Sequence, residues 1–409
     1  MGSIKLRIML SYKEAFSLIK EQFQNLKLET ENVKLENSLH RTLAENVISD
    51  INLPPFDNSA VDGYAVQFDN SINKWEMIGE ITAGNFKEFN LTENQTVKIM
   101  TGAKIPFNCN AVIPIEDVKV QDKKVRLSPG SKYLETMNIR LKATDIGEGE
   151  ITVEKGTFLK PRHLSSIASC GKSELKVYKK LKFGILATGD ELITVNEKPE
   201  GDKIRVSNVY SLLGEVSEVN QEWINFGFVK DDRDKIKEKV NNILNSDIDI
   251  LLTTGGVSVG EYDYLKDIFE ELGVKKIFWR ANIKPGKPCY FGIFTRNDKL
   301  KLVFGLPGNP VSSQVNFKVY IKENINNLFG NQNTEQIKAE LLNDLRKKDK
   351  KRHFMKGVLK KEKDKYFITS KFSQSSGNMV ELSKANCLIV IEEEHLDPKK
   401  GEIVNCIPM

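Results

Sequence analysis

LLTTGGVSVG, at residues 251–260, is the stretch that decides the fold. An apolar run ends there in glycines and small hydroxyl residues, and apolar residues at helical spacing follow from Tyr264 to Leu272. Glycine lets backbone N–H groups approach a ligand closely, and the N-terminus of a helix attracts anions. The stretch therefore predicts a buried strand, an anion-binding turn and a helix. Because a glycine that merely turns the chain gives the same pattern, the turn alone does not establish a site.

Two more loops follow short apolar runs in the same region. Phe183 to Ala187 leads into TGDE at residues 188–191, and Leu302 to Gly305 leads into LPGNP at residues 306–310. In open parallel sheets, ligands bind where the carboxyl ends of the strands gather. We therefore expect the three loops to lie together at one edge of a sheet.

The order of the elements predicts an α/β multidomain protein. Helical patterns at 209–219 and 234–244 alternate with apolar runs at 224–229 and 249–253, which indicates a doubly wound α/β domain. Short β-branched runs from about residue 51 to 147, and again after residue 330, predict two mostly β modules. Ser11 and Glu14 form a capping-box pattern at the start of an amphipathic helix.

Composition excludes several classes of protein. The chain has 409 residues, 40% of them hydrophobic and 29% charged, which indicates an ordered globular protein of several domains. Its five cysteines and four histidines are scattered, so zinc sites and disulfide frameworks are not expected. A net charge of +5 is too small at this length to indicate a nucleic-acid partner. The basic run at 346–352 is interrupted by Asp349 and lacks aromatic residues, so it predicts a solvated loop.

No apolar run reaches the roughly eighteen residues that a membrane span requires, and the apolar patch at 8–10 is too short for a signal peptide. We therefore expect no membrane association and a cytoplasmic protein.

The charged residues of the loops indicate chemistry at a phosphate. Lys284 and Lys287 stand beside prolines in IKPGKP, and proline stiffens the backbone that carries them, which favours anion binding over a solvated turn. The loops also supply the carboxylates of Asp62, Asp190, Glu191 and Asp263, with no Ser–His or Cys–His nucleophile pair. Carboxylates without such partners suit Mg²⁺, which completes its shell with water and substrate phosphates. By composition alone, Asp62 before a glycine is an ordinary turn residue.

Six motifs, in order, resemble the molybdopterin molybdenumtransferase family, which includes the C-terminal domain of gephyrin. The resemblance covers nearly the whole chain. The motifs are PPFDNSAVDGYAV from residue 54, IMTGAKIP from 99, ATGDEL from 187, TTGGVSVGEYDY from 253, IKPGKP from 283 and FGLPGNPVS from 304.

The resemblance implies an enzyme that inserts molybdate into adenylylated molybdopterin and releases AMP, with Mg²⁺ as the metal. It implies a homodimer of four-domain chains: an elongated α+β dimerisation domain at 1–50 and 147–178, a mostly β domain at 51–146, a molybdopterin-binding α/β domain at 179–329, and a β domain at 330–409. The molybdopterin adenylyltransferase is a further candidate partner. Molybdate and tungstate are similar tetrahedral dianions, so the sequence leaves the choice between them open.

The motif matches assign roles to individual residues. Asp62, Thr101, Glu191, Asp263 and Lys284 are the expected catalytic residues, and Glu191 and Asp263 the expected metal ligands. Lys284, Lys287 and Arg280 are expected to bind oxyanions, and the loop at 254–260 to bind the molybdopterin phosphate. The expected substrate-binding residues are Thr254, Gly255, Gly256, Ser258, Gly260, Arg280, Lys287, Pro307, Pro310, Asp145 and Ser376.

The chain departs from the family pattern at two places. Arg280 stands where the family often has lysine, which keeps the charge but changes its geometry. Residues 140–144 replace the family's arginine-rich stretch before Asp145, so substrate contact by that segment is open. Two alternatives also stay open: a molybdopterin adenylyltransferase, which the four-domain layout disfavours, and a non-catalytic scaffold, which the complete site motifs disfavour.

Overall fold

The computed structural model describes residues 9–85, 87–256, 264–331 and 336–409. The chain divides into two compact units. The larger unit is Met1–Glu31 with Tyr178–Met409, and the smaller unit is Asn32–Val177. Among the described residues, no helix combines the length and apolar character that crossing a membrane requires.

The described part of the larger unit centres on a six-stranded sheet. Its strands are β13 (Lys182–Thr188), β16 (Glu222–Val229), β17 (Ile250–Thr254), β18 (Lys275–Arg280), β20 (Pro288–Arg296) and β21 (Lys299–Leu306). The order is β16-β13-β17-β21-β20-β18, and the first four strands run parallel. These four match the predicted α/β alternation. The antiparallel strands β20 and β18 are not among the predicted strands.

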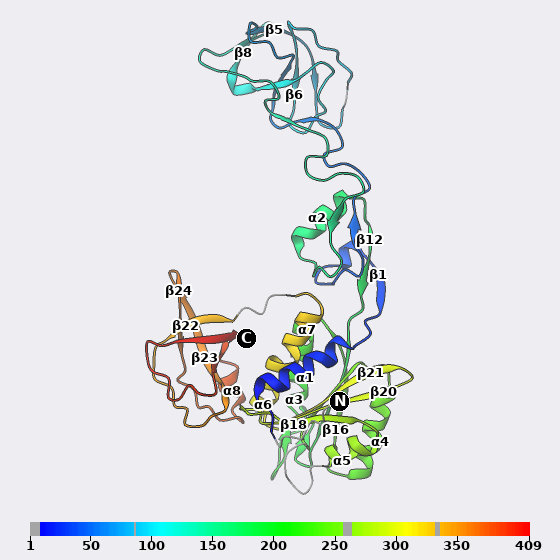
Figure 1. The fold of residues 1–409 in the computed structure, drawn as a ribbon, viewed down its shortest axis with the longest axis vertical. Helices are drawn as coiled ribbons and strands as arrows, with labels where there is room; N and C mark the ends of the chain where they lie inside the picture. Colours follow the sequence, from blue (N-terminus) through cyan, green and yellow to red (C-terminus); the bar gives the residue numbers. More distant parts are fainter. Residues whose placement is uncertain (1–8, 86, 257–263, 332–335) are drawn as a thin grey trace, which may run out of the picture. The chain divides into compact units, whose positions relative to one another are not determined.

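Helices cover both faces of this sheet, which confirms the predicted doubly wound fold (Figure 1). Because successive side chains of a strand point to opposite faces, Phe183 and Ile185 of β13 pack in one core and Leu186 in the other. The first core includes residues of α1 (Tyr12–Gln24), α3 (Asn208–Glu218), α6 (Pro310–Asn316), the π-helix η3 (Phe317–Lys322) and α7 (Glu323–Leu328). The second includes residues of α4 (Arg233–Leu244) and α5 (Leu265–Glu271).

The N-terminal helix α1 starts as the sequence predicts. Ser11 Oγ accepts a hydrogen bond from the Glu14 N–H, and the Glu14 carboxylate accepts one from the Ser11 N–H, so the capping box is confirmed. Tyr12 stacks on Tyr320 of η3 with ring centroids 5.4 Å apart. Helix α1 therefore packs in the larger unit. The domain limits that the resemblance implies stay a prediction.

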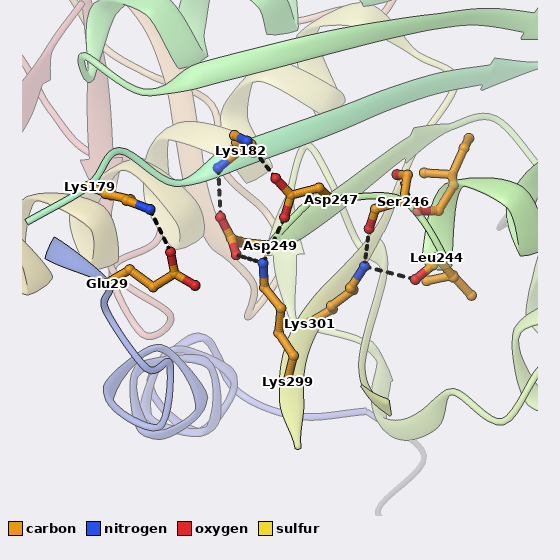
Figure 2. Close-up of polar contacts among 10 residues, drawn as sticks. Glu29, Lys179, Lys182, Leu244, Ser246, Asp247, Asp249, Lys299 and Lys301 are labelled. Atoms are coloured by element: carbon orange, nitrogen blue, oxygen red, sulfur yellow. Dashed lines mark hydrogen bonds and ion pairs between the residues drawn. The ribbon is translucent and has the colours of Figure 1, made fainter. Parts of the chain in front are cut away.

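Lysine–carboxylate pairs surround the N-terminal ends of the parallel strands (Figure 2). The Asp247 carboxylate lies 2.5 Å from Lys182 Nζ and 3.1 Å from Lys299 Nζ. Asp249 accepts a hydrogen bond from the Lys182 N–H at 2.8 Å. The buried Lys301 Nζ donates to the Leu244 carbonyl at 2.8 Å, at the C-terminus of α4, where a cation is favoured. These contacts tie the starts of neighbouring strands together.

A second sheet lies near the C-terminus of the larger unit. Its strands are β19 (Ile283–Lys284), β22 (Ile337–Leu341), β23 (Arg352–Glu362), β24 (Lys365–Thr369), β25 (Cys387–Ile391) and β26 (Ile403–Pro408). The short helix α8 (Met379–Leu382) lies between β24 and β25 in the chain. Pairing of β23 with β25 closes the strands β22 to β26 into a barrel, which confirms the predicted C-terminal β module. Strand β19 joins β23 at the edge.

The prediction that residues 346–352 form a solvated loop is wrong for Lys347 and Arg352. The Lys347 side chain is buried, and its Nζ donates to the carbonyls of Asp349 and Glu393 at 2.8 Å each. Arg352 is buried between Glu393 and the ring of Tyr12, whose centroid lies 4.6 Å from the guanidinium carbon. Charge density in a sequence does not reveal this burial, because Glu393 and Tyr12 come from distant segments.

The smaller unit is mostly β, as predicted. Its main sheet has the order β7-β4-β6-β5-β9-β8, made of β4 (Gly63–Val66), β5 (Lys74–Ile81), β6 (Gln95–Ile99), β7 (Ala111–Pro114), β8 (Val118–Gln121) and β9 (Lys124–Leu127). Two small pairings join β3 (Asn58–Ser59) with β10 (Ile139–Arg140) and β2 (Val47–Ile48) with β11 (Ile151–Val153), and α2 spans Pro161–Ser169. Strands β1 (Thr30–Lys34) and β12 (Glu174–Tyr178) pair where the chain passes from one unit to the other.

Candidate functional site

A pocket of about 970 Å³ opens at the carboxyl ends of β13, β17 and β21 in the larger unit. The three loops that the sequence singles out, after β13, after β17 and after β21, all contribute to its wall. Its volume falls in the range of small-molecule sites. The described lining residues are Ala187, Thr188, Glu191, Leu192, Pro199, Lys203, Ile204, Arg205, Val206, Ser207, Asn208, Thr254, Gly255, Gly308, Asn309, Pro310, Gly377 and Met379.

Glycine is required where the loops after β13 and β17 meet. A Cβ on Gly255 would lie 2.3 Å from the Thr188 carbonyl oxygen, and one on Gly256 would lie 2.9 Å from Thr188 Oγ1. Both glycines also have positive φ, at 88° and 62°, a conformation that side chains disfavour. At Gly189, a Cβ would lie 2.4 Å from the Glu191 carboxylate. The glycines therefore let two strand ends and one carboxylate close around the pocket.

Two buried polar atoms in the pocket wall have no hydrogen-bond partner among the described residues. They are Thr188 Oγ1 and Asn208 Oδ1, on side chains that belong to residues 4% and 8% exposed. The amide nitrogen of Asn208 donates to the Gly308 carbonyl at 2.7 Å and to Thr254 Oγ1 at 3.3 Å, so the side chain is held in place. Because an unmade hydrogen bond in the interior is costly, a polar ligand is the natural partner for these two atoms.

The wall of the pocket also carries charges of both signs. Lys203 directly precedes strand β15 (Ile204–Arg205), and Arg205 is its last residue; this strand pairs with β14 (Leu192–Ile193). Lys203 Nζ donates to the Asp190 carbonyl at 3.2 Å, and Arg205 Nε donates to the Glu197 carbonyl at 2.9 Å. Lys203 Nζ also forms an ion pair with Asp202 Oδ1 at 3.3 Å, whereas the carbonyl that binds Arg205 does not neutralise the guanidinium. The Lys203 and Arg205 side chains suit an anionic group of a ligand, and the Glu191 carboxylate suits a hydrogen-bond donor or a metal on the same ligand.

A separate pair of candidate residues lies in the smaller unit. The Asp62 carboxylate accepts hydrogen bonds from both the N–H and the hydroxyl of Thr101, at 2.7 Å each. Both bonds lower the pKa of Asp62 below its ordinary value, and the bond from the backbone N–H has the larger effect. The predicted residues Asp62 and Thr101 are thus brought together by β4 and β6. Asp145 is bound by Arg140, whose Nη2 lies 2.9 Å and 2.8 Å from the two carboxylate oxygens.

Comparison with known proteins identifies the family. Family models described as "MoeA N-terminal region (domain I and II)", "Probable molybdopterin binding domain" and "MoeA C-terminal region (domain IV)" match residues 10–171, 184–327 and 338–409. The chain is 34% identical to the molybdopterin molybdenumtransferase of Haemophilus influenzae over 91% of this chain and 92% of that one. It belongs to the molybdopterin molybdenumtransferase family.

Two further similar proteins support the assignment to this family. The molybdopterin molybdenumtransferase of Bacillus subtilis is 33% identical over 87% of this chain and 84% of its own length. A crystal structure of a molybdopterin biosynthesis moeA protein from Pyrococcus horikoshii OT3 is 29% identical, covers 98% of this chain and 100% of its own, and has a TM-score of 0.82. The chain is therefore a member of a transferase family of molybdenum cofactor biosynthesis.

Several residues predicted from the molybdenumtransferase motifs lie in the pocket and others do not. Glu191, Thr254, Gly255 and Pro310 line it. Ser376 is its neighbour, since its carbonyl accepts a hydrogen bond from the Val311 N–H at 3.1 Å. Gly256 adjoins Gly255, and Pro307 is buried beside the lining residue Gly308. Ser258, Gly260 and Asp263 fall outside the described residues.

The expected oxyanion-binding cations are not part of the described lining. The Arg280 guanidinium stacks on the ring of Trp279 at 4.0 Å, and Lys284 Nζ lies 3.7 Å from the Asp349 carboxylate. The Lys287 backbone carbonyl accepts a hydrogen bond from the Ala281 N–H. Lys203 and Arg205 provide the cations of the described pocket wall instead.

Sequence reasoning missed the segment at 203–208. Its side chains Lys203, Arg205 and Asn208 enter the wall because β15 pairs in parallel with β14 just after the TGDE loop. A signal was present: the segment IRVSN directly precedes the predicted helix at 209–219, and polar residues at a helix start often bind ligands. Gly377 and Met379 come from the C-terminal module; the predicted residue Ser376 adjoins Gly377, whereas Met379 was not predicted.

Proposed function

We propose that this protein inserts molybdate into adenylylated molybdopterin, releasing AMP and the finished molybdenum cofactor. The observation that carries the proposal is the pocket at the strand ends, with Thr188 Oγ1 and Asn208 Oδ1 unpaired in its wall. Its walls come mainly from the region that matches a molybdopterin-binding family model. Molybdopterin carries the hydrogen-bonding atoms of its pterin ring and a phosphate, which suit the unpaired groups and the two cations respectively.

The charges of the reactants explain why fixed cations belong in such a site. Molybdate is a dianion and adenylylated molybdopterin is itself anionic, so their approach is repulsive in the absence of positive charge. In this proposal Lys203 and Arg205 bind the phosphate-bearing substrate, and Lys284 attracts molybdate. Asp62, kept ionised by Thr101, acts at the reacting centre. Preorganised charges of this kind stabilise a transition state without a covalent protein intermediate.

We also propose a role for Mg²⁺, which would neutralise phosphate charge. Among the described residues, no group of three or more histidine, cysteine or acidic side chains could hold a metal. One or two carboxylates are nevertheless enough for Mg²⁺, because this ion completes its shell with water and substrate phosphates. Glu191, at the pocket wall, and Asp263 are the proposed ligands.

A reconstituted assay separates this proposal from its two alternatives. Purified protein is supplied with adenylylated molybdopterin, Mg²⁺ and either molybdate or tungstate, and AMP and cofactor are measured. We expect both products to form together, and the ratio of the two rates gives the metal preference. Pyrophosphate release from ATP and molybdopterin without molybdate would indicate an adenylyltransferase instead. Binding of molybdopterin without any turnover would indicate a scaffold.

The proposed assembly is a homodimer, with the molybdopterin adenylyltransferase as the partner that delivers the substrate. Light scattering of the purified chain tests the first point. Transfer of adenylylated molybdopterin between the two enzymes, in the presence of a trap for the free compound, tests the second.

A further inference from the structure

Lys284 lies at the edge of the C-terminal barrel, beside a carboxylate. It belongs to β19, which pairs in parallel with β23 of the C-terminal barrel, so that Lys284 is the register partner of His353. Its side chain is 55% exposed, and its Nζ lies 3.7 Å from Asp349 Oδ2. The lysine that is proposed to attract molybdate therefore has a carboxylate beside it.

This carboxylate is fixed by contacts that do not involve the lysine. Asp349 Oδ1 lies 2.7 Å from His353 Nε2 and accepts a hydrogen bond from the Lys351 N–H at 3.1 Å. The His353 side chain is only 4% exposed. Burial lowers the pKa of His353, so the ring is neutral near pH 7, and since an ionised carboxylate only accepts, its proton is on Nε2.

Asp349 is charged at neutral pH. Burial alone would raise its pKa, but the hydrogen bond from His353 and that from Lys351 outweigh burial, and the pKa lies below its ordinary value. The neighbouring Lys347 ammonium is bound to the backbone carbonyls of Asp349 and Glu393. A fixed negative charge therefore stands next to the Lys284 ammonium.

We propose that Asp349, clamped by His353, is the counter-ion of Lys284 and limits how strongly this lysine attracts oxyanions. The inference rests on the proposed role of Lys284 in molybdate binding. An oxyanion that reaches Lys284 meets attraction from the ammonium and repulsion from a carboxylate 3.7 Å away. Asp349 is thus a positioning residue that acts through Lys284, and His353 acts through Asp349.

The test is direct binding of sodium molybdate, measured by calorimetric titration of the full-length protein. Asp349→Asn removes the charge but keeps an oxygen that can accept from Lys351 and His353. We expect it to bind molybdate about fivefold more tightly, a size typical of a partly exposed ion pair. Its affinity for molybdopterin should not change. Asp349→Glu, which restores the charge, should return molybdate affinity toward that of the wild type.

Three further variants show whether the effect passes through the named residues. In a Lys284→Met background, Asp349→Asn should no longer tighten molybdate binding, because the ammonium that it releases is missing. His353→Gln keeps a donor at the position of Nε2 and should behave as the wild type. His353→Leu removes the clamp and should shift molybdate affinity in the same direction as Asp349→Asn.

The outcomes separate this inference from the proposed function. Unchanged or weaker molybdate binding by a folded Asp349→Asn protein would overturn the counter-ion role while leaving wild-type turnover intact. A tightening that persists in the Lys284→Met background would overturn the action through Lys284. If the wild type neither binds molybdate nor turns over, the proposed function fails and this inference fails with it.

Discussion

At the scale of single residues, the two unpaired atoms in the pocket wall are the sharpest sign of a ligand. Thr188 Oγ1 is buried without a partner among the described residues, although a buried hydroxyl that makes no hydrogen bond costs about 1–3 kcal/mol. Its neighbour Thr253 is also buried, but its hydroxyl donates to the Phe304 carbonyl at 3.4 Å. The two threonines therefore form a matched pair for mutation.

We expect Thr188→Val to stabilise the ligand-free protein and to weaken its binding of molybdopterin. Removing the unpaired hydroxyl should raise the free energy of unfolding by about 1 kcal/mol, and losing the bond to the ligand should lower affinity about tenfold. Urea unfolding and a molybdopterin titration measure the two effects. Thr253→Val should show the opposite pattern, with lower stability and unchanged affinity. Equal affinity for Thr188→Val and the wild type would mean that this hydroxyl does not touch the ligand.

The contact between Asp62 and Thr101 predicts a shift in the pH dependence of the rate. The Thr101 N–H and hydroxyl lower the pKa of Asp62, so removing the hydroxyl must raise it. If ionised Asp62 is required, Thr101→Val should lose activity at a higher pH than the wild type as the solution is acidified. Thr101→Ser keeps the hydroxyl and should follow the wild-type curve. An unchanged acid limb in Thr101→Val would show that Asp62 does not control it.

At the scale of elements, the ion pairs at the N-terminal edge of the sheet hold β13, β17 and β21 in register (Figure 2). Hydrogen bonds from Lys182 and Lys299 lower the pKa of Asp247 to about 2, and the bond from Lys182 has the larger effect. This edge lies at the opposite ends of the strands from the pocket, so it serves stability. The pairs are partly exposed, with 69% of the Asp247 side chain accessible, and solvent reduces their strength.

We expect Asp247→Asn to lower the free energy of unfolding by about 1 kcal/mol at pH 7, after allowance for solvent screening. Because the folded pKa lies below the unfolded value of about 3.9, this stability is present above pH 4 and is lost as the pH falls toward 2. Urea unfolding at several pH values should show the gap between variant and wild type closing below pH 4. Glu238→Gln, which removes an exposed carboxylate of α4, is the control and should show no such gap.

At the scale of the whole molecule, the candidate groups are distributed over both units. The pocket lining comes from the larger unit, whereas Asp62 and Thr101 belong to the smaller one. The smaller unit is an insertion, because the chain enters it after Glu31 and leaves it at Val177. At that passage the Lys179 N–H donates to the Glu29 carbonyl at 2.8 Å, so the two connecting segments run side by side.

This proximity makes a clean deletion possible. Replacing residues 32–177 with a short glycine–serine turn should leave a folded larger unit, since the hydrophobic cores described in it draw on residues outside the deleted segment. We expect the deletion protein to bind molybdopterin with near wild-type affinity and to release no AMP, because Asp62 is gone. Full-length Asp62→Ala should show the same loss of activity. Failure of a folded deletion protein to bind molybdopterin would contradict the assignment of the pocket.

Much of the fold could be predicted because its signals are local. The apolar run of β17, the glycines after it and the capping box of α1 each act within a few residues, so periodicity and turn chemistry reveal them. Strands β18 and β20 were harder to predict, since their pairing with β21 depends on contacts along the sheet. The motifs were sufficient to indicate the family because each is a short run of neighbouring residues that can be recognised without knowledge of the fold.

The sequence by itself determined the α/β order, the glycine turns and the family, all of which depend on neighbouring residues. Only the tertiary structure showed that Asn208, Lys203 and Arg205 enter the pocket wall, and that Lys284 stands beside Asp349, which lies in the segment before β23. It also showed that Lys347, within a basic run that reads as solvated, is buried against carbonyl oxygens. The reason is physical: burial and charge pairing depend on which distant segments pack together, and a linear pattern does not contain those distances.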